Sequence, residues 1–315
     1  MTTHRPPLRA AVVGVGYLGA FHAEKYAKLE GVELVGVVDT DPERARTIGE
    51  RQHTRAFTDY QDLFGQVDCV SLAVPTPAHF PLAKALLEQD IDVLVEKPMT
   101  STAAEGWALV ELAAARHRIL QVGHLERFNP AIRSLAGVIT RPRFIECHRL
   151  APFVERGTEV DVILDLMIHD LDVILSVVNS ELVRVEAVGV PVLSESVDIA
   201  NARLRFAGGV IANITASRVA LKRERKIRFF QADTYVAVDY GDRSIRICRR
   251  VPATDGSLPS ITVEQQHFGD ADPLADEIEA FVDAVRQRTR PLVDGATAVR
   301  ALEVAERIRA SLESV

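Results

Sequence analysis

The chain has 315 residues, which is long for one hydrophobic core and favours two domains. Its 47% hydrophobic and 26% charged residues are typical of a globular protein in water. A formal net charge of −7 leaves no overall basic surface, which argues against nucleic acid as a partner and favours a small molecule.

The three cysteines, Cys69, Cys147 and Cys248, are odd in number and lack the spacing of metal ligands. They favour a reducing, cytoplasmic location over a disulfide framework. Because no apolar segment reaches the length of a bilayer-spanning helix, we expect no membrane association.

Short apolar segments alternate with helical patterns over residues 1–123. The expected strands cover 8–14, 32–39, 69–74, 91–96 and 119–122, and the expected helices cover 17–29, a segment from Pro42, 79–89 and 102–117. Short buried strands separated by helices are typical of a parallel sheet that is covered on both faces. The sequence therefore predicts a doubly wound α/β domain that ends near Gly123.

A glycine-rich turn follows the first expected strand. Residues 14–19 read GVGYLG, the GxGxxG pattern, and they open the first expected helix. Gly14 permits a tight turn, Gly16 lets the backbone approach a pyrophosphate, and Gly19 allows close packing of the helix. Since a helix N-terminus attracts anions, this turn predicts dinucleotide binding. The predicted cofactor contacts in the turn are Gly14, Gly16, Tyr17, Leu18 and Gly19.

Asp39 ends the second expected strand, 20 residues beyond Gly19. A carboxylate at this place accepts hydrogen bonds from the adenosine ribose and repels a 2′-phosphate. Asp39 therefore favours NAD over NADP as the cofactor. Arg44 and Arg46 follow closely and leave NADP open as the alternative.

Two further strand ends point to the same edge of the expected sheet, where ligands of parallel sheets bind. Pro98 disfavours a helical conformation at Lys97, so Lys97 should stay extended at the rim and could hydrogen-bond a substrate hydroxyl. A surface lysine paired with Glu96 is the alternative reading. His79 is expected to be structural or to lie beside the cofactor. The predicted cofactor contacts at these ends are Pro75, Thr76, His79, Glu96 and Lys97.

Residues 161–178, DVILDLMIHDLDVILSVV, predict a helix of inverted polarity. Asp161, Asp165 and His169 follow at intervals of four, and Asp172 comes three later, so all four fall near one face. We assign the other faces to Val, Ile, Leu and Met. Such a helix is buried, and buried carboxylates and imidazoles are costly unless they are paired or used. This stripe is the predicted catalytic region, with a metal site at Asp161, Asp165 and His169 as the alternative.

The remaining residues, 124–315, predict an α+β domain. The expected strands cover 182–191, 197–206, 209–218, 226–231, 234–240 and 243–249, and two helices cover 273–289 and 295–313. The chain's one basic cluster lies at 222–228 and is expected to be a solvated or interface strand, with binding of an anionic substrate as the alternative.

The ordered motifs GVGYLG, AVPTPAHF, VEKP, VGHLERFNPA and DLMIHD resemble those of the Gfo/Idh/MocA family of nicotinamide-dependent sugar and polyol oxidoreductases. The resemblance covers essentially the whole chain. It implies an N-terminal Rossmann domain and a C-terminal α+β domain with an open, mostly antiparallel sheet that commonly forms a homodimer or homotetramer contact. It also implies that Lys97, Asp165 and His169 form the catalytic group and that no metal is needed.

In the implied reaction, a secondary alcohol gives a hydride to the nicotinamide while its hydroxyl proton goes to a base. His169 is the candidate base because imidazole titrates near neutrality. Asp165 can orient the imidazole or hold an adjacent hydroxyl, and Lys97 can hydrogen-bond the reacting oxygen.

The segment HLERFNP at 124–130, together with the inverted helix, most resembles the branch of the family that oxidises the 3-hydroxyl of UDP-N-acetylglucosamine to a ketone. The alternatives are a free sugar, inositol or another polyol as substrate, and a sensor that binds NAD without turnover. The predicted substrate contacts are Glu126, Arg127, Asn129, Asp165 and His169. The arginines available for a diphosphate are Arg127, Arg149, Arg218 and Arg225.

Overall fold

The computed structural model describes residues 6–154, 160–253 and 258–312. Its contacts divide the chain into two compact units, residues 1–125 with 272–299 and residues 126–271 with 300–315. The sequence predicts one division near Gly123, whereas the first unit also includes a segment close to the end of the chain. No helix of the described part of the chain is both long and apolar enough to cross a membrane.

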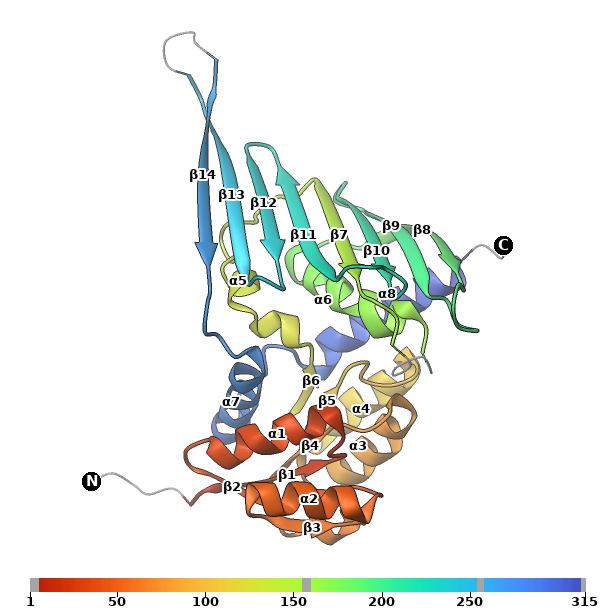
Figure 1. Ribbon diagram of the computed structural model, residues 1–315, viewed down its shortest axis with the longest axis vertical. Coiled ribbons are helices and arrows are strands. Elements are labelled where there is room, and N and C mark those ends of the chain that lie inside the picture. The colour runs from red at the N-terminus through yellow and green to blue at the C-terminus, as the bar shows by residue number, and fades with distance from the viewer. Residues whose placement is uncertain (1–5, 155–159, 254–257, 313–315) are drawn as a thin grey trace, which may run out of the picture. The chain divides into compact units, whose positions relative to one another are not determined.

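The first unit contains a six-stranded sheet in the order β3-β2-β1-β4-β5-β6, in which all neighbouring strands are parallel (Figure 1). This order reverses direction between β1 and β4, as in a Rossmann fold, which confirms the predicted doubly wound sheet. The unit's elements are β1 (Leu8–Val13), α1 (Tyr17–Lys28), β2 (Val32–Val38), α2 (Pro42–Gln52), β3 (Arg55–Phe57), η1 (Tyr60–Leu63), β4 (Cys69–Leu72), η2 (Thr76–Ala78), α3 (His79–Glu88), β5 (Asp92–Glu96), α4 (Ala103–Ala115), β6 (Leu120–Gly123) and α7 (Pro273–Gln287).

The late helix α7 belongs to this unit because of its apolar face. Ile278, Phe281 and Val282 are buried in one cluster with Tyr26 of α1 and with residues of β1 and β2. Helix α7 begins at Pro273, and the Asp272 side chain caps it by accepting a hydrogen bond from the Ala275 amide. A helix recruited from about 150 residues downstream of β6 thus completes the core beside α1.

The second unit contains an eight-stranded sheet in the order β14-β13-β12-β11-β7-β10-β9-β8 (Figure 1). Its neighbours are antiparallel except for β7 and β10, so the predicted open, mostly antiparallel sheet is confirmed. The elements are η3 (Leu125–Phe128), α5 (Pro130–Arg133), β7 (Phe144–Leu150), η4 (Ile163–Met167), α6 (Ile168–Val177), β8 (Leu182–Val190), β9 (Ile199–Phe206), β10 (Ile211–Ser217), β11 (Glu224–Gln231), β12 (Thr234–Asp239), β13 (Ser244–Val251) and β14 (Ser260–His267), followed by α8 (Gly295–Ala310), which runs from the first unit into the second.

Two strands of this sheet, β7 and β14, are absent from the sequence prediction. In β7 the buried positions alternate as Ile145, Cys147 and Arg149, so a charged residue occupies an inward position and hides the pattern of a half-buried strand. In β14 every residue is exposed, so no buried face imposes alternation on its sequence. Backbone pairing with β11 specifies β7 instead, and backbone pairing with β13 specifies β14.

The inverted helix differs from its prediction in two ways. It begins as a π-helix, η4, and continues as the α-helix α6, so the four-residue intervals before Ile168 do not keep one face as they would at 3.6 residues per turn. The assignment of the other faces to apolar residues alone is wrong, because Asp170 lies there and is 1% exposed. Segments of π-helix occur frequently at functional sites, and Asp165 lies within this one.

Candidate active site

The glycine turn between β1 and α1 has the shape that a dinucleotide requires. Gly14 has φ +83°, and a Cβ there would lie 2.6 Å from the Ala73 carbonyl oxygen. A Cβ on Gly19 would lie 1.8 Å from the Gly14 carbonyl oxygen, so the helix reaches the turn only with glycine. At Gly16 a Cβ would meet nothing within 4 Å, which leaves open space over the backbone. The turn therefore fits a pyrophosphate placed close to the main chain.

Helix α1 starts directly after this turn. Gly16 is its N-cap residue and makes no side-chain cap hydrogen bond. Tyr17 is 67% exposed and packs edge-on against Phe21, with ring centroids 5.3 Å apart, and Leu18 is half-buried. The predicted contacts Tyr17 and Leu18 thus stand at the mouth of the turn.

Asp39 follows β2 and is 6% exposed. Its Oδ2 accepts a hydrogen bond from the Val15 amide at 3.0 Å, which ties the strand end to the glycine turn. Its Oδ1 accepts from the Asp41 amide at 3.0 Å and from Arg44 Nη1 at 3.1 Å. Arg46 pairs instead with two glutamates of its own helix. Of the two arginines that keep NADP as the alternative cofactor, Arg44 lies beside Asp39.

His79 ties two strand ends together. Its Nδ1 lies 2.8 Å from the Pro98 carbonyl oxygen and its Nε2 lies 2.8 Å from the Val74 carbonyl oxygen. Burial lowers the pKa of His79, and the two carbonyl contacts oppose this effect. The ring joins the turn after β4 to the turn after β5, in line with the expected structural role. Pro75 is exposed and Thr76 half-buried in the first of these turns.

Glu96 and Lys97 end β5 in different environments. The Glu96 carboxylate is buried, with Oε1 3.0 Å from His22 Nε2, so its side chain points into the first unit. The carboxylate fills the space beside Gly123, where a Cβ would lie 2.8 Å from Glu96 Oε1. Its Oε2 accepts a hydrogen bond from the Lys97 amide at 3.3 Å. Lys97 is half-buried and follows this anchored residue directly.

Asp161 has a structural role at the start of the inverted helix. Its Oδ1 accepts hydrogen bonds from the Ile163 and Leu164 amides at 3.0 and 3.1 Å. Its Oδ2 forms an ion pair with Arg309 Nε at 2.7 Å. Among the described residues Asp161, Asp165 and His169 do not bring three metal-binding atoms together, so the alternative metal site is not formed.

Asp165 and His169 are both half-buried, one in η4 and the other in α6. Asp172 is 1% exposed and its Oδ1 lies 3.4 Å from Arg127 Nη1. Of the predicted stripe, Asp161 caps the helix and Asp172 pairs with Arg127, whereas the catalytic roles of Asp165 and His169 stay predictions. Lys97 belongs to the first unit, and this pair belongs to the second.

A buried ion network that the sequence reading missed supports this helix. Arg149 of β7 donates to Asp170 from Nε at 2.8 Å and from Nη2 at 3.0 Å, and its Nη1 donates to Glu126 at 3.0 Å. Its guanidinium also lies 5.0 Å from the centroid of the Tyr240 ring. Asp170 could have been noticed as a fifth polar residue in the helix. Its pairing with a residue of β7 could not, because β7 itself was not predicted.

The three residues of the segment after β6 are held by protein partners. Glu126 pairs with Arg149, and Arg127 pairs with Asp172. The Asn129 side chain caps α5 through the Ala131 amide and lies 3.5 Å from Glu126 Oε2. The segment is therefore tied by its side chains to other parts of the second unit.

Two of the arginines proposed for a diphosphate are structural. The Arg149 and Arg218 side chains are 3% and 5% exposed, and Arg218 Nε donates to Asp198 at 2.7 Å. The basic cluster begins just before β11 and continues on it, where Arg228 pairs with Glu146 at 2.9 Å and Lys226 lies 3.7 Å from Asp239. These pairs agree with the predicted solvated or interface strand.

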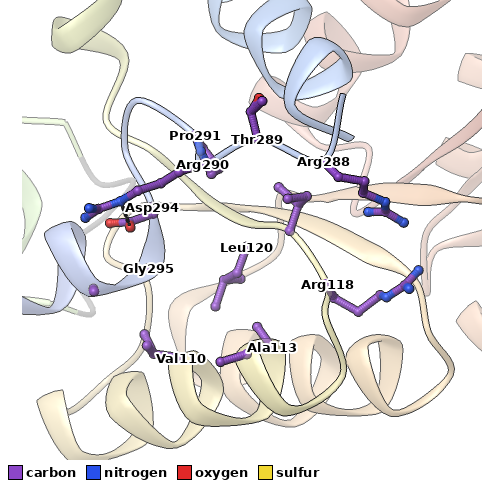
Figure 2. A pocket seen from close by; sticks show the side chains of 13 residues that line it. Val110, Ala113, Arg118, Leu120, Arg288, Thr289, Arg290, Pro291, Asp294 and Gly295 are labelled. Atoms are coloured by element: carbon purple, nitrogen blue, oxygen red, sulfur yellow. Dashed lines mark hydrogen bonds and ion pairs between the residues drawn. The ribbon is translucent and has the colours of Figure 1, made fainter. Parts of the chain in front are cut away.

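A separate pocket in the first unit lies beside the C-terminal part of α4 and the segment before α8 (Figure 2). Val110 and Leu120 form its apolar floor, and Arg118, Arg288 and Arg290 surround it. Arg288 pairs with Asp92, and Arg290 pairs with Asp294. No residue of the predicted cofactor, substrate or catalytic set lines this pocket, so it is distinct from the candidate active site.

The six-stranded parallel sheet, the open space over Gly16 and the acid at the end of β2 define a dinucleotide-binding oxidoreductase. Residues 8–124 match the family model described as "Oxidoreductase family, NAD-binding Rossmann fold". Residues 132–236 match the GFO/IDH/MocA C-terminal domain. The chain belongs to the Gfo/Idh/MocA family of oxidoreductases, and it is an enzyme of the dehydrogenase type.

Within this family, the chain is similar to two kinds of dehydrogenase. The chain is 38% identical over 309 residues to the UDP-N-acetylglucosamine 3-dehydrogenase of Acidithiobacillus ferrooxidans, with 98% of each chain covered. A solved structure of that enzyme matches with a TM-score of 0.91 and covers 97% of each chain. An inositol 2-dehydrogenase of Saccharopolyspora erythraea is 29% identical over 306 residues, which are 92% of this chain and 86% of that one.

Proposed function

We propose that the protein oxidises the 3-hydroxyl of UDP-N-acetylglucosamine to a ketone with NAD as the hydride acceptor. The observation that carries this proposal is the full-length similarity to the Acidithiobacillus enzyme, which spans both units and every predicted motif. The weaker similarity to inositol 2-dehydrogenases supports inositol or another polyol as the second candidate substrate.

We propose NAD over NADP because of the surroundings of Asp39. Its buried carboxylate lies at the end of β2 and accepts hydrogen bonds from the Val15 and Asp41 amides. A ribose hydroxyl can donate a further hydrogen bond to this carboxylate. A 2′-phosphate would meet this negative charge. Arg44 pairs with Asp39 and so neutralises part of that charge, but it does not replace the carboxylate as an acceptor.

For the chemical step we propose roles for Lys97, Asp165 and His169. When bound, the nicotinamide supplies the acceptor for the hydride. His169 accepts the hydroxyl proton, and Asp165 orients the imidazole or an adjacent hydroxyl. The Lys97 ammonium donates a hydrogen bond to the reacting oxygen and stabilises its developing negative charge. The backbone of Lys97 is anchored for this task by the Glu96 carboxylate.

Glu126, Arg127 and Asn129 are proposed to shape the place of the sugar. Their side chains are already held by Arg149, Asp172 and the start of α5, so substrate binding costs them little further ordering. Preorganised groups of this kind discriminate between hydroxyl patterns, because a misplaced hydroxyl leaves a polar atom unpaired.

The decisive test is NADH formation, followed as absorbance, with a panel that contains UDP-N-acetylglucosamine, myo-inositol and free sugars. We expect turnover with the nucleotide sugar, and turnover with inositol alone would refute it as the substrate. Lys97→Ala and His169→Ala should each lower kcat by roughly 10²–10⁴-fold while NAD binding stays within about threefold. Lys84→Ala and His267→Ala are matched controls, since both residues are exposed. Equal activity of all four variants would refute the assigned roles.

We also propose a homodimer or homotetramer formed through the eight-stranded sheet. Its edge strands expose apolar side chains, with Ile261 and Val263 of β14 71% and 60% exposed and Val183 of β8 50% exposed. Light scattering on the purified protein measures the assembly, and Ile261→Lys with Val263→Lys should shift it toward the monomer. A mass of one chain for the unaltered protein would refute this proposal.

A cytoplasmic location is proposed from the three free cysteines, of which Cys69 and Cys147 are buried. Burial raises the pKa of the Cys147 thiol, so it remains protonated and unreactive at neutral pH. Cell fractionation with an antibody against the protein checks the location.

A further inference from the structure

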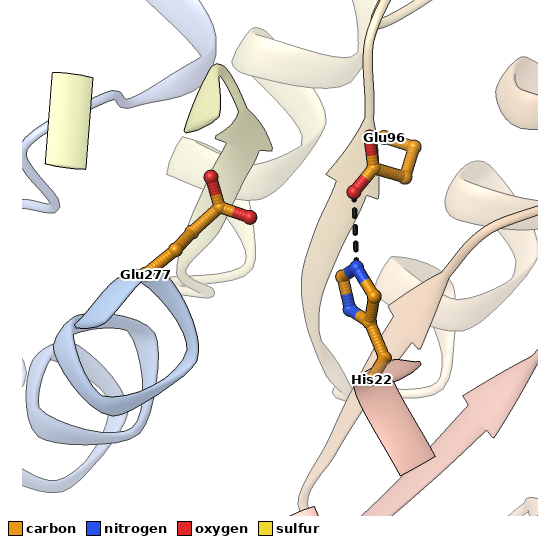
Figure 3. Close-up of side chains that lie close together, drawn as sticks. All are labelled: His22, Glu96 and Glu277. Carbon is orange, nitrogen blue, oxygen red and sulfur yellow. Dashed lines mark hydrogen bonds and ion pairs between the residues drawn. The ribbon is translucent and has the colours of Figure 1, made fainter. Parts of the chain in front are cut away.

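Three ionisable side chains meet inside the first unit, behind the end of β5 (Figure 3). They are His22 of α1, Glu96 of β5 and Glu277 of α7, and one side-chain nitrogen or oxygen atom of each lies within 4.8 Å of the others. His22 and Glu277 are 0% exposed and Glu96 is 8% exposed. Two carboxyl groups therefore share one buried space inside the unit.

The hydrogen bonds of this cluster are divided unequally between the two carboxyl groups. Glu96 receives His22 Nε2 at 3.0 Å and the Lys97 amide at 3.3 Å. Both oxygens of Glu277 have no hydrogen-bond partner. Gln121 of β6 points its amide at the backbone carbonyl of Glu277, at 3.1 Å, and not at the carboxyl group. The Glu96 carboxyl group thus has two hydrogen-bond partners in the protein, and the Glu277 carboxyl group has none.

An ionised carboxylate that is fully buried without a donor is very costly, and a second carboxylate beside it adds repulsion. A carboxylic acid avoids both costs and gains an O–H donor. The acceptor in reach is the Glu96 carboxylate, either directly after a small side-chain rotation or through one water molecule.

We propose that Glu277 is a neutral carboxylic acid in the working enzyme and that its proton fixes the Glu96 carboxylate and, through it, the backbone of Lys97. Glu277 is then a positioning residue for the catalytic lysine, and this part of the inference rests on the proposed function. Ionisation of Glu277 would push Glu96 away from it, and Glu96 is attached directly to the residue that meets the substrate oxygen.

The described ionisable and polar groups beside Glu277 agree with this assignment. The groups that face it are His22 and Tyr26 from α1, Glu96 from β5 and Gln121 from β6. None of them offers the carboxyl group a fixed positive charge. Burial, and after it the charge of Glu96, hold the pKa of Glu277 well above its usual range.

Thermal unfolding between pH 6 and pH 9 tests whether Glu277 is protonated. The full-length protein is compared with Glu277→Gln, which mimics the neutral acid. A raised folded-state pKa means that stability is lost as pH rises toward that pKa. We expect the melting temperature of the unaltered protein to fall relative to Glu277→Gln by about 3 °C per pH unit. Glu279→Gln, an exposed neighbour on the same helix, should follow the unaltered protein. Parallel curves for all three proteins would overturn the proposal.

The link to Lys97 is tested by the rate at which an amine-specific acylating reagent labels Lys97, followed by mass spectrometry, and by kcat. Glu277→Ala should change the labelling rate at least about fivefold and lower kcat at least about tenfold at unchanged KM for NAD, and Glu277→Gln should restore both. Unchanged labelling in Glu277→Ala would overturn the positioning role. The labelling and melting measurements need no substrate, so they stand even if UDP-N-acetylglucosamine is not turned over. A stoichiometric divalent metal in the purified protein that Glu277→Gln loses would also overturn the proposal, because a cation would then neutralise the cluster.

Discussion

Arg149→Met tests how the inverted helix is held in the second unit. The substitution removes a buried guanidinium and leaves Asp170, 1% exposed, and Glu126 without their shared cation. Breaking a buried ion pair from one side costs about 3–5 kcal/mol, and because two carboxylates lose their partner we expect Arg149→Met to lose about 5 kcal/mol at neutral pH. Asp170→Asn leaves the pair between Arg149 and Glu126 intact, so we expect a loss of about 2 kcal/mol.

The two variants should also differ in their dependence on pH. Burial raises the pKa of Asp170, and Arg149 opposes that rise. Without Arg149 the folded-state pKa of Asp170 rises further above its unfolded value. A carboxyl group of this kind contributes stability at low pH that is lost as pH increases through its folded pKa. The deficit of Arg149→Met should therefore be small near pH 5 and grow toward pH 8.

The assay is urea unfolding followed by two signals. The chain has one tryptophan, Trp107 in α4, so its fluorescence reports the first unit, whereas far-UV circular dichroism reports both. Arg149→Met should shift the dichroism transition and leave the fluorescence midpoint nearly in place if the two units unfold separately. An Asp170→Asn loss as large as that of Arg149→Met, or a deficit of Arg149→Met that does not grow with pH, would refute the electrostatic account.

Two further changes test the cofactor turn. Gly19→Ala places a Cβ 1.8 Å from the Gly14 carbonyl oxygen and should lower both the melting temperature and NAD affinity, whereas Gly16→Ala meets no neighbour and should lower NAD affinity alone, as measured by calorimetry; equal melting temperatures for the two would contradict the packing argument. Asp39→Ser removes the negative charge and releases Arg44 for a 2′-phosphate, so the ratio of kcat/KM for NAD to that for NADP should fall by roughly 100-fold; an unchanged ratio would show that Asp39 does not select the cofactor.

The first unit was largely predictable because its signals are local. Strand, glycine turn, helix and Asp39 follow one another within about 30 residues, and each has a fixed meaning in the backbone geometry of a parallel sheet. Helix α7 was predicted as a helix, but its place beside α1 was not. Ile278 and Phe281 give α7 an apolar face, but the sequence does not show which hydrophobic core this face joins.

The second unit shows where local pattern fails. The strand β7 carries Arg149 at an inward position, and the reason is Asp170, which lies 21 residues later on a different element. Neither residue explains the other until the sheet and helix are packed. The edge strand β14 is exposed along its whole length, so its pairing with β13 comes from backbone hydrogen bonds that leave no trace in side-chain polarity.

The sequence by itself determined the nucleotide-binding turn, the acid at the end of β2, the oxidoreductase family and the residues proposed for catalysis, because each is written in contiguous motifs. Only the tertiary structure decided which polar residues have structural partners. Asp161 and Asp172 satisfy a helix end and an arginine, and Glu277 reaches Glu96 from about 180 residues away. Burial and pairing are properties of packed neighbours, so charge and spacing along the chain cannot reveal them.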